Sequence, residues 1–398
     1  MPRFIHHDLR LLNPAFSSSL LDVLTDLEQL RRAQIIGTTP YPVFLQLKGV
    51  FHMLESFASA RIEGNHTTLA EYVETKVATL ARTGEPLSDT IREIENIETA
   101  MRHVEVEVRP SAAISEHLIR GLHATTVKNL EREGDRSPGA YRLDKVAIGQ
   151  AEHAPPEFIQ VPSYMQELVE FINRSDPPKY DLIKVALAHH RFAWIHPFFN
   201  GNGRVVRLLT YALLIKYGFR VDRYQRLLNP TAVFCADRTR YYAMLANADS
   251  GTDDALETWC HYVLAGVRDE LSKVDRLTDY KFLKSQILAP ALAHARERRL
   301  ITPEEEAILR VVIEQGVAKA GHFHSAMHGR TDAQRTYQVK KLLASGLLQP
   351  IKEGARQYSI GFTQSPLLRG VMMALTTEGF IPPALNAPAT PAVVPASP

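Results

Sequence analysis

Apolar residues recur at helical spacing through most of the first 300 residues. Leu20, Val23, Leu24, Leu27 and Leu30 recur three and four residues apart, as they do on one buried helix face. The same pattern predicts helices over residues 45–61, 89–108, 115–130, 181–195 and 204–217. Glycine follows the first and the last of these, where it commonly ends a helix. The chain is therefore predicted to be mainly α.

Residues 139–162 break this helical pattern. Short apolar runs alternate there with glycine and proline, at Tyr141, Leu143, Val146, Ile148, Pro155, Pro156, Phe158, Ile159 and Val161. This alternation predicts a β-hairpin within a helical body. Such an insertion more often serves function than core packing.

The pattern changes again after residue 300. Thr302-Pro303-Glu304-Glu305-Glu306 combines a hydroxyl cap, an early proline and first-turn acids, which is typical of a helix start. We expect helices to about residue 315, over 322–327 and over 332–344, then strands over 347–351 and 357–360. Three helices and a two-stranded wing predict a winged helix-turn-helix domain.

A chain of 398 residues is too long for one ordinary domain. We expect an N-terminal helical region over 1–110, a core over 111–265, a helical linker over 266–300 and the winged helix over 301–365. From Ile381 onward the composition is almost entirely Pro, Ala, Val and Ser. Residues 380–398 are therefore predicted to be a disordered tail.

Composition narrows the class of protein. The net charge is +2 and 45% of residues are hydrophobic, so no global field favours a nucleic acid or a membrane. Cys235 and Cys260 lack metal-type spacing, which favours a reducing compartment. The first twelve residues have no apolar signal core, and no apolar run reaches the roughly 18 residues of a membrane span. We expect a cytoplasmic protein without a membrane partner.

The most informative segment is His-Pro-Phe-Phe-Asn-Gly-Asn-Gly-Arg-Val-Val-Arg over residues 196–207. His196 ends an apolar helix, and histidine is the natural general base near neutral pH. Gly201 and Gly203 allow a tight turn and close approach of the backbone to a ligand. The helix beginning near Asn202 presents free N–H groups, which favour an anion.

Two cations complete this group. Arg204 and Arg207 lie on adjacent turns of one helix face, and guanidinium groups match phosphate oxygens bidentately. A base, an anion-binding turn and two cations are the parts that phosphoryl chemistry on a nucleotide requires.

This loop resembles the signature of the Fic family, His-x-Phe-x-(Asp/Glu)-(Gly/Ala)-Asn-(Gly/Lys)-Arg-x-x-Arg. The chain matches it at His196, Phe198, Gly201, Asn202, Gly203, Arg204 and Arg207. The resemblance covers roughly residues 10–265. It implies a helical domain with a β-hairpin flap beside the loop.

Fic proteins mostly transfer AMP from ATP to a Ser, Thr or Tyr hydroxyl of a target protein. The resemblance implies that His196 deprotonates that hydroxyl and that Asn202 and the amides of Gly201–Gly203 hold the α-phosphate. It assigns the β-phosphate to Arg204 and the γ-phosphate to Arg207.

Further roles follow from the same resemblance. A flap over residues 141–161 would bind the target segment by strand pairing. Tyr242 would stack on adenine, and a homodimer is expected.

One signature position departs from the family. Asn200 stands where the family has an acidic residue that orients Mg²⁺. An amide oxygen can coordinate a hard cation but adds no negative charge, so metal affinity should fall. Mg²⁺ use, the rate and the choice of nucleotide therefore stay open.

A second family element lies upstream, within a helix expected over about 45–64. Ser59-Ala60-Arg61-Ile62-Glu63-Gly64 resembles the inhibitory pattern (Ser/Thr)-x-x-x-Glu-(Gly/Asn). The resemblance implies that Glu63 pairs with Arg207 and removes the γ-phosphate's partner. In some Fic proteins the same glutamate positions water for AMP removal.

Two alternatives to protein adenylyltransferase remain. The predicted winged helix carries seven cations against Asp332 and Glu353, a local charge of +5: Lys319, Arg330, Arg335, Lys340, Lys341, Lys352 and Arg356. This favours a nucleotide-sensing, DNA-binding transcription regulator with weak or no transfer activity. The other alternative is an enzyme that removes AMP or transfers another phosphate-linked group. The pattern identifies neither the target protein nor the trigger that relieves inhibition.

Overall fold

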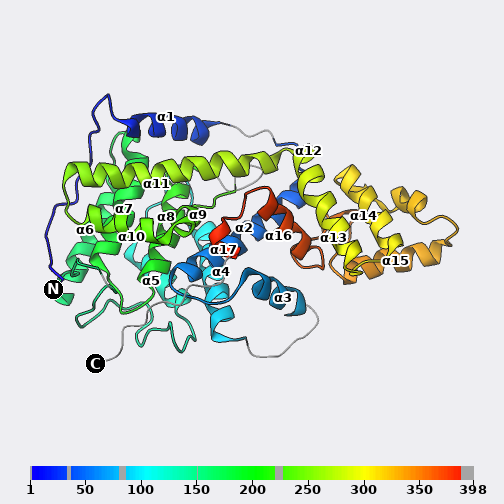
Figure 1. Ribbon diagram of the computed structural model, residues 1–398, viewed down its shortest axis with the longest axis horizontal. Coiled ribbons are helices and arrows are strands. Elements are labelled where there is room, and N and C mark those ends of the chain that lie inside the picture. The colour runs from blue at the N-terminus through cyan, green and yellow to red at the C-terminus, as the bar shows by residue number, and fades with distance from the viewer. Residues whose placement is uncertain (1, 34–36, 80–86, 150, 220–226, 387–398) are drawn as a thin grey trace.

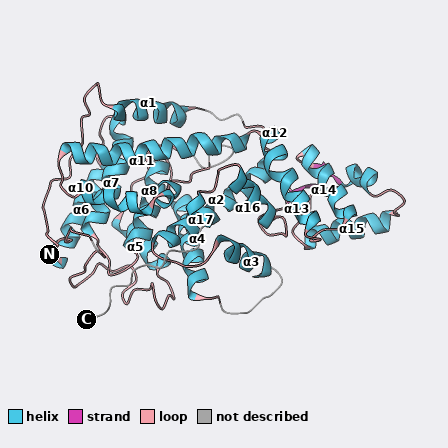
Figure 2. Cartoon of the chain, viewed as in Figure 1, coloured by secondary structure: helices cyan, strands magenta, loops and turns pink. Residues whose placement is uncertain are grey.

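The structure is a computed structural model that describes residues 2–33, 37–79, 87–149, 151–219 and 227–386. It is mainly helical, as the periodicity predicts (Figure 2). The first eight helices are α1 Ser19–Arg32, α2 Tyr41–Ile62, α3 Leu69–Thr79, α4 Asp89–Glu107, α5 Glu116–Thr126, α6 Val161–Asn173, α7 Asp181–Ile195 and α8 Asn202–Lys216.

The remaining α-helices are α9 Thr231–Ala236, α10 Arg238–Ala248, α11 Asp253–Val274, α12 Tyr280–Phe282, α13 Ala289–Glu297, α14 Pro303–Gln315, α15 Asp332–Ala344, α16 Leu368–Thr377 and α17 Pro383–Asn386. Short 3₁₀ segments are η1 Phe158–Gln160, η2 Pro178–Tyr180, η3 Asp275–Thr278 and η5 Ala320–Ala326, and η4 Leu283–Leu288 is a π-helix. The strands are β1 Ala318–Lys319, β2 Leu348–Pro350 and β3 Gln357–Ile360.

Helices α7 and α8 form the centre of the molecule. Both are buried on almost every side because α2, α4, α5, α6, α10 and α11 surround them. The long helix α11 lies along this group, and α1 packs on α11 (Figure 1). Trp259 of α11 donates its indole N–H to the Ala186 carbonyl of α7 at 2.7 Å. The loop between α7 and α8 is therefore held between two fully packed helices.

Several predicted boundaries are confirmed. The helix predicted over 181–195 is α7 without change, and the helix predicted from residue 204 begins at Asn202. Helix α2 begins at Tyr41, before the expected residue 45, because Pro42 in its first turn is compatible with a helix start. The start of α14 has the full capping box, with Thr302 and Glu305 bonded reciprocally.

The C-terminal part contains α14, α15 and a small antiparallel sheet at the end of the molecule opposite α6 (Figure 1). The strand order is β1-β3-β2, and Leu348 pairs with Ile360. The two expected strands and the helix over 332–344 are confirmed, whereas the expected helix over 322–327 is the 3₁₀ segment η5.

The predicted β-hairpin over 139–162 is wrong. Apart from residue 150, which lies outside the described residues, this segment has no paired strands and makes one isolated bridge, from His153 to Arg3. Prolines at 155 and 156 cannot donate to a strand ladder. The carbonyls of Asp144 and Pro156 accept from the side chain of Arg142 instead.

The predicted disordered tail is wrong over its first seven residues. Phe380, Ile381 and Leu385 are buried, and the last of these belongs to α17, which packs on α9. These apolar side chains continue the packing of α16 against α3 and α13, before the Pro- and Ala-rich composition dominates. The rest of the expected tail, 387–398, lies outside the described residues. The other domain boundaries stay predictions.

In the described ranges, no helix combines the length and the apolar character that crossing a membrane requires.

Gln46 connects α2 to the chain that follows β3. Its Oε1 accepts hydrogen bonds from the Phe362 N–H at 3.1 Å, the Thr363 N–H at 3.0 Å and the Thr363 hydroxyl at 2.7 Å. Gln46 is 5% exposed, so these donors have little access to replacement water.

Replacing Gln46 with Ala should lower the free energy of unfolding by about 1–3 kcal/mol, because buried N–H donors lose their acceptor. Thr363→Val removes one donor and leaves both N–H bonds intact, so it should cost less than about 1 kcal/mol. Urea unfolding of both variants measures the difference. Equal losses would show that the amide of Gln46 does not carry this contact.

Candidate active site

His196 caps the C-terminal end of α7 in a left-handed conformation, with φ 49° and ψ 62°. Its N–H still donates to the Phe192 carbonyl at 3.0 Å, which closes the last helical turn. The carbonyls of His196 and Pro197 accept from the Nε and the backbone N–H of Arg142, both at 2.9 Å. The backbone that carries the expected base is thus held on both sides.

Burial lowers the pKa of the half-buried His196 to about 4. A hydrogen bond with the backbone of Ala193 and the carboxylate of Glu63 oppose this effect, while Arg142 and His153 add to it. The ring is consequently neutral at pH 7 and able to accept a proton.

The turn before α8 depends on two residues. Gly201 has φ 73°, and a Cβ there would lie 2.9 Å from Cγ1 of Val127. The buried Asn202 closes the loop, since its Oδ1 accepts from the Phe198 N–H at 2.9 Å and its Nδ2 donates to the Phe198 carbonyl at 2.8 Å. Asn202 therefore shapes the loop, and its contact with an α-phosphate stays a prediction.

Asn200 turns toward the protein. Its Oδ1 accepts from the Gly201 N–H at 2.7 Å, and its Nδ2 donates to the Gly134 carbonyl at 3.3 Å. Its own N–H donates to Asp135 at 3.3 Å. Among the described residues there is also no group of three or more His, Cys, Asp or Glu that could hold a metal ion. The residues around Asn200 do not fit a protein-bound Mg²⁺ ion.

Arg207 is buried and held by the end of α2. Its Nη2 lies 2.8 Å from Oε1 of Glu63 and 2.9 Å from the Ser59 carbonyl, and its Nε donates to the Ser59 hydroxyl at 2.8 Å. Gly64, which follows Glu63 in the chain, has φ 97°. Burial alone would raise the pKa of Glu63, but Arg207 and Arg204 outweigh it and hold that pKa below its ordinary value. The structure brings Ser59, Glu63 and Arg207 together.

The carboxylate of Glu63 lies directly over the first turn of α8. A Cβ on residue 203 would come within 2.1 Å of Glu63 Oε1, so Gly203 is required for this approach. The N-terminal turn of a helix favours negative charge. Glu63 thus takes the position at which an anionic ligand would bind.

Arg204 also pairs with a carboxylate, that of Glu93, which the sequence analysis did not predict. Its side chain is fully buried, with Nη1 at 2.8 Å from Oε1 of Glu93 on α4 and Nη2 donating to the Glu133 carbonyl at 3.0 Å. Oε2 of Glu93 accepts from Nδ2 of Asn65 at 2.8 Å. Asn65 directly follows the inhibitory pattern, which is a signal that could have found it. Nothing in the local sequence marks Glu93.

Tyr242 of α10 is 42% exposed and lies beside the end of α2. Its hydroxyl is 3.5 Å from the Ile62 carbonyl, and its ring centroid is 5.3 Å from that of Tyr241. It is therefore near Glu63, and its contact with adenine stays a prediction.

His123 supports the loop from α5. Its ring stacks on Phe198 with centroids 3.8 Å apart, its Nδ1 accepts from the Gly139 N–H at 2.9 Å, and its Nε2 donates to the Asn200 carbonyl at 3.2 Å. These partners require the neutral ring, since protonated Nδ1 could not accept from Gly139.

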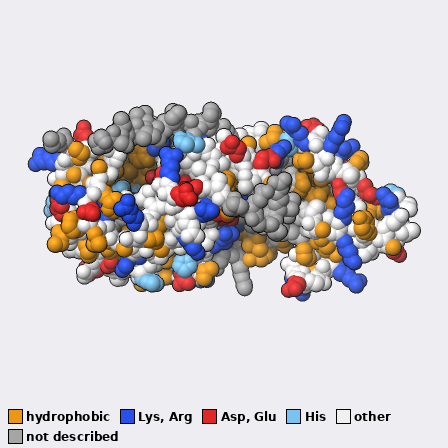
Figure 3. All heavy atoms as spheres, turned by 90° about the horizontal axis from the view of Figure 1, so that it is seen from below, with side chains coloured by type: hydrophobic (Ala, Val, Ile, Leu, Met, Phe, Trp, Pro, Cys, Tyr) orange, Lys and Arg blue, Asp and Glu red, His pale blue; other side chains and the backbone are white. Residues whose placement is uncertain are grey.

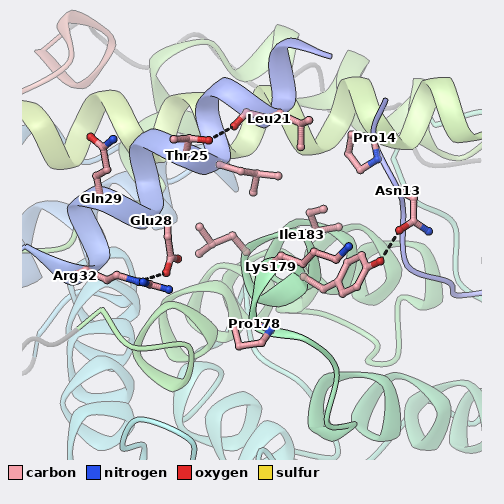
Figure 4. Close-up of a pocket in the computed structure, with 13 residues that line it drawn as sticks. Asn13, Pro14, Leu21, Thr25, Glu28, Gln29, Arg32, Pro178, Lys179 and Ile183 are labelled. Atoms are coloured by element: carbon pink, nitrogen blue, oxygen red, sulfur yellow. Dashed lines mark hydrogen bonds and ion pairs between the residues drawn. The ribbon is translucent and has the colours of Figure 1, made fainter. Parts of the chain in front are cut away.

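A groove of about 510 Å³ lies elsewhere, between α1 and the start of α7 (Figure 4). Leu21, Leu24, Leu182 and Ile183 line it, with Glu28 and other polar side chains around them. None of the predicted site residues contributes to this groove.

Burial lowers the pKa of His123 to about 4, although Asp135 opposes the shift. In the unfolded chain the imidazole of His123 is protonated below about pH 6.5, whereas in the folded protein it is protonated only below about pH 4. The stability from this group is complete above pH 6.5 and falls by about 3 kcal/mol as the pH drops to 4.

NMR titration should give a midpoint near 4 for the ring of His123. His123→Gln should remove the matching part of the pH dependence of urea unfolding. A midpoint near 6.5 would contradict the neutral, doubly bonded ring.

Part of this chain is similar to a known protein family. Residues 113–214 match the family model described as Fic/DOC family. The protein adenylyltransferase Fic of Drosophila virilis is 28% identical over 197 residues, which cover 49% of this chain and 37% of that protein. The same-named protein of Nematostella vectensis is 27% identical over 258 residues, covering 63% and 53%. The chain thus spans between about a third and a half of these curated relatives.

Two crystal structures show the same fold. A Fic family protein from Desulfovibrio desulfuricans G20 has a TM-score of 0.52 at 19% identity, covering 87% of this chain and 97% of that one. A Fic domain containing signaling protein from Bacteroides thetaiotaomicron has a TM-score of 0.50 at 18% identity, covering 66% and 97%. Residues 113–214 of this chain therefore form a Fic/DOC family domain.

Proposed function

We propose that this chain is a protein adenylyltransferase, which transfers AMP from ATP to a Ser, Thr or Tyr hydroxyl of a target protein or of the chain itself. The observation that carries the proposal is geometric: His196 ends α7, and the turn that follows it opens α8, which carries two buried arginines. The curated relatives, named protein adenylyltransferase Fic, support it.

The reaction uses these groups as follows. His196 takes the proton of the target hydroxyl, whose oxygen attacks the α-phosphorus. The bond from the α-phosphorus to the bridging oxygen breaks, and pyrophosphate leaves. N–H groups at the start of α8 stabilise charge on the α-phosphate. Arg204 and Arg207 bind the β- and γ-phosphates once the triphosphate displaces their carboxylates. A Mg²⁺ ion, where used, would be bound by the phosphates, since Asn200 faces the protein.

Glu63 restrains this activity in our proposal. Its carboxylate holds Arg207 and lies at the anion position of α8, so ATP must displace it before the γ-phosphate can bind. A carboxylate so close to the base could also orient water, which makes AMP removal the alternative reaction.

The target segment is proposed to bind along residues 141–161. Leu143 and Ile159 are each 79% exposed, and Phe199 in the motif loop is 57% exposed. Exposed apolar side chains in this segment and in the motif loop support docking of a peptide. The cytoplasmic location and the homodimer stay predictions.

A second candidate function is DNA binding by a winged helix formed by α14, α15 and the three strands. Three of its seven cations pair with carboxylates: Arg330 with Glu304, Arg335 with Asp332 and Lys341 with Glu305. The other four are exposed and have no ion pair among the described residues: Lys319, Lys340, Lys352 and Arg356. On the face shown in Figure 3, several Lys and Arg side chains project from this end of the molecule, with a few acidic side chains among them. Lys340 shares the exposed face of α15 with Thr336 and Tyr337, which is 70% exposed.

Intact mass after incubation with ATP and Mg²⁺ tests the transferase. Glu63→Gly should gain AMP about 10 to 100 times faster than the parent, because it removes a charge-assisted bond of about 1.5–3 kcal/mol that competes with ATP. Adding His196→Ala should abolish the gain.

Glu107→Gly is the matched control, because Glu107 also ends a helix but has no ion pair in the described structure. It should behave like the parent. No gain by the Glu63→Gly variant, with ATP binding still measurable, would reject the transferase in favour of nucleotide sensing. Loss of AMP from a pre-modified protein would instead identify the removal reaction.

Fluorescence anisotropy with duplex DNA tests the second candidate. Binding should weaken steeply with salt, and Lys340→Gln should reduce the log–log salt slope by about 0.9 through the loss of one phosphate contact. Lys179→Gln, which changes an exposed lysine on η2, should leave the slope unchanged. Absence of binding at low salt, or equal slopes for both variants, would rule out this surface.

A further inference from the structure

Arg142 is 4% exposed and lies where the segment 141–161 meets the end of α7. Its guanidinium group donates to carbonyls rather than to a carboxylate. Nε reaches the His196 carbonyl at 2.9 Å, and Nη2 reaches those of Pro156 at 2.6 Å and Ile195 at 3.4 Å. Nη1 donates to the Asp144 carbonyl at 3.1 Å.

These contacts provide hydrogen-bond donors for carbonyls at the left-handed turn of His196. The last carbonyls of a helix have no partner within the helix, and the turn prevents α7 from continuing. A cation at this end also interacts favourably with the helix dipole. The planar fork of one guanidinium binds both Ile195 and His196, so it fixes the backbone from which the imidazole projects.

The same side chain closes the neighbouring segment. Asp144 and Pro156 are twelve residues apart, and Arg142 binds both of their carbonyls. This bonding takes the place of strand pairing, which the described residues of the segment do not form. The exposed Leu143 and Ile159 flank the closed part, so their placement relative to His196 depends on one buried guanidinium.

We propose that Arg142 is a positioning residue that holds His196 in its left-handed conformation and ties the target-binding segment to the base. This inference rests on the proposed transferase function. Arg142 does not act on the substrate itself. It acts through the carbonyls of His196 and of the segment.

The positive charge of Arg142 also affects the pKa of His196, which an uncharged structural contact would not do. Three charged or titratable groups bear on the ring of His196: Arg142 and His153 lower its pKa, and Glu63 raises it. Removal of the charge at 142 should therefore raise the pKa of His196. A lysine at 142 keeps the charge but cannot bind four carbonyls at once.

The test compares Arg142→Lys, Arg142→Gln and Arg120→Gln, each with Glu63→Gly. Arg120 is the matched control, because it also donates to a carbonyl next to this segment, that of Gly139, but makes no contact with His196. NMR titration gives the pKa of His196 without turnover. Single-turnover AMP transfer gives the rate, and thermal unfolding checks the fold.

Arg142→Lys should transfer AMP at least about tenfold more slowly with the pKa of His196 little changed. Arg142→Gln should show a similar loss together with a raised pKa, and the pH at which the rate reaches half its maximum should rise with it. Arg120→Gln should change neither. If both Arg142 variants keep the parental rate and pKa, the proposal is overturned.

The outcomes also distinguish failure of the proposed role of Arg142 from failure of the proposed transferase function. If the Glu63→Gly parent transfers no AMP, the proposed function fails, whereas the titration of His196 still reports on Arg142. In the unchanged chain, the Nε proton of Arg142 should exchange slowly with water because the His196 carbonyl binds it. Rapid exchange would overturn the proposal even if neither substituted variant folds.

Discussion

The structure depends on the burial of two guanidinium groups at the start of α8. Arg204 and Arg207 lie in the core beside apolar neighbours, where an unpaired charge is very costly. Removing one partner of such a pair typically costs about 3–5 kcal/mol. Glu93 and Glu63 therefore stabilise the fold by pairing with these two arginines. In the proposed transferase, autoinhibition follows from the same constraint, because buried arginines that bind phosphates need another anion when no nucleotide is bound.

Helix α2 brings these requirements together. At one end Gln46 holds the chain after β3, and at the other Glu63 holds Arg207. Two residues further on, Asn65 binds Glu93, which holds Arg204. The end of α2 thus contacts one arginine directly and the other through a single carboxylate. In the proposed transferase, a bound triphosphate would compete with both contacts, and both depend on residues 63–65.

Sequence patterns predicted the elements whose determinants are local. Helix α7, the turn at Gly201 and the capped start of α14 depend on periodicity, glycine and capping residues that stand next to each other in the chain. The pairing of Glu63 with Arg207 was accessible only because the family pattern supplied it. The roles of Glu93 and His123 were not predicted, because the neighbouring sequence of a buried acid or histidine does not indicate its distant partner. The hairpin failed for the opposite reason: its alternating pattern was real, but proline and one arginine took the place of strand pairing.

The substitution at Asn200 changes where negative charge lies around the loop. The amide oxygen of Asn200 carries no negative charge; it accepts from the Gly201 N–H and lies 3.5 Å from Nη2 of Arg204. The nearby side chain of Asp135 is 4% exposed, and its carboxylate accepts from the backbone N–H of Asn200. The front of the site is consequently more positive than it would be with an acid at 200. In the proposed transferase, attraction for the triphosphate would then depend on α8 and its arginines, and a divalent ion would be coordinated by the phosphates themselves.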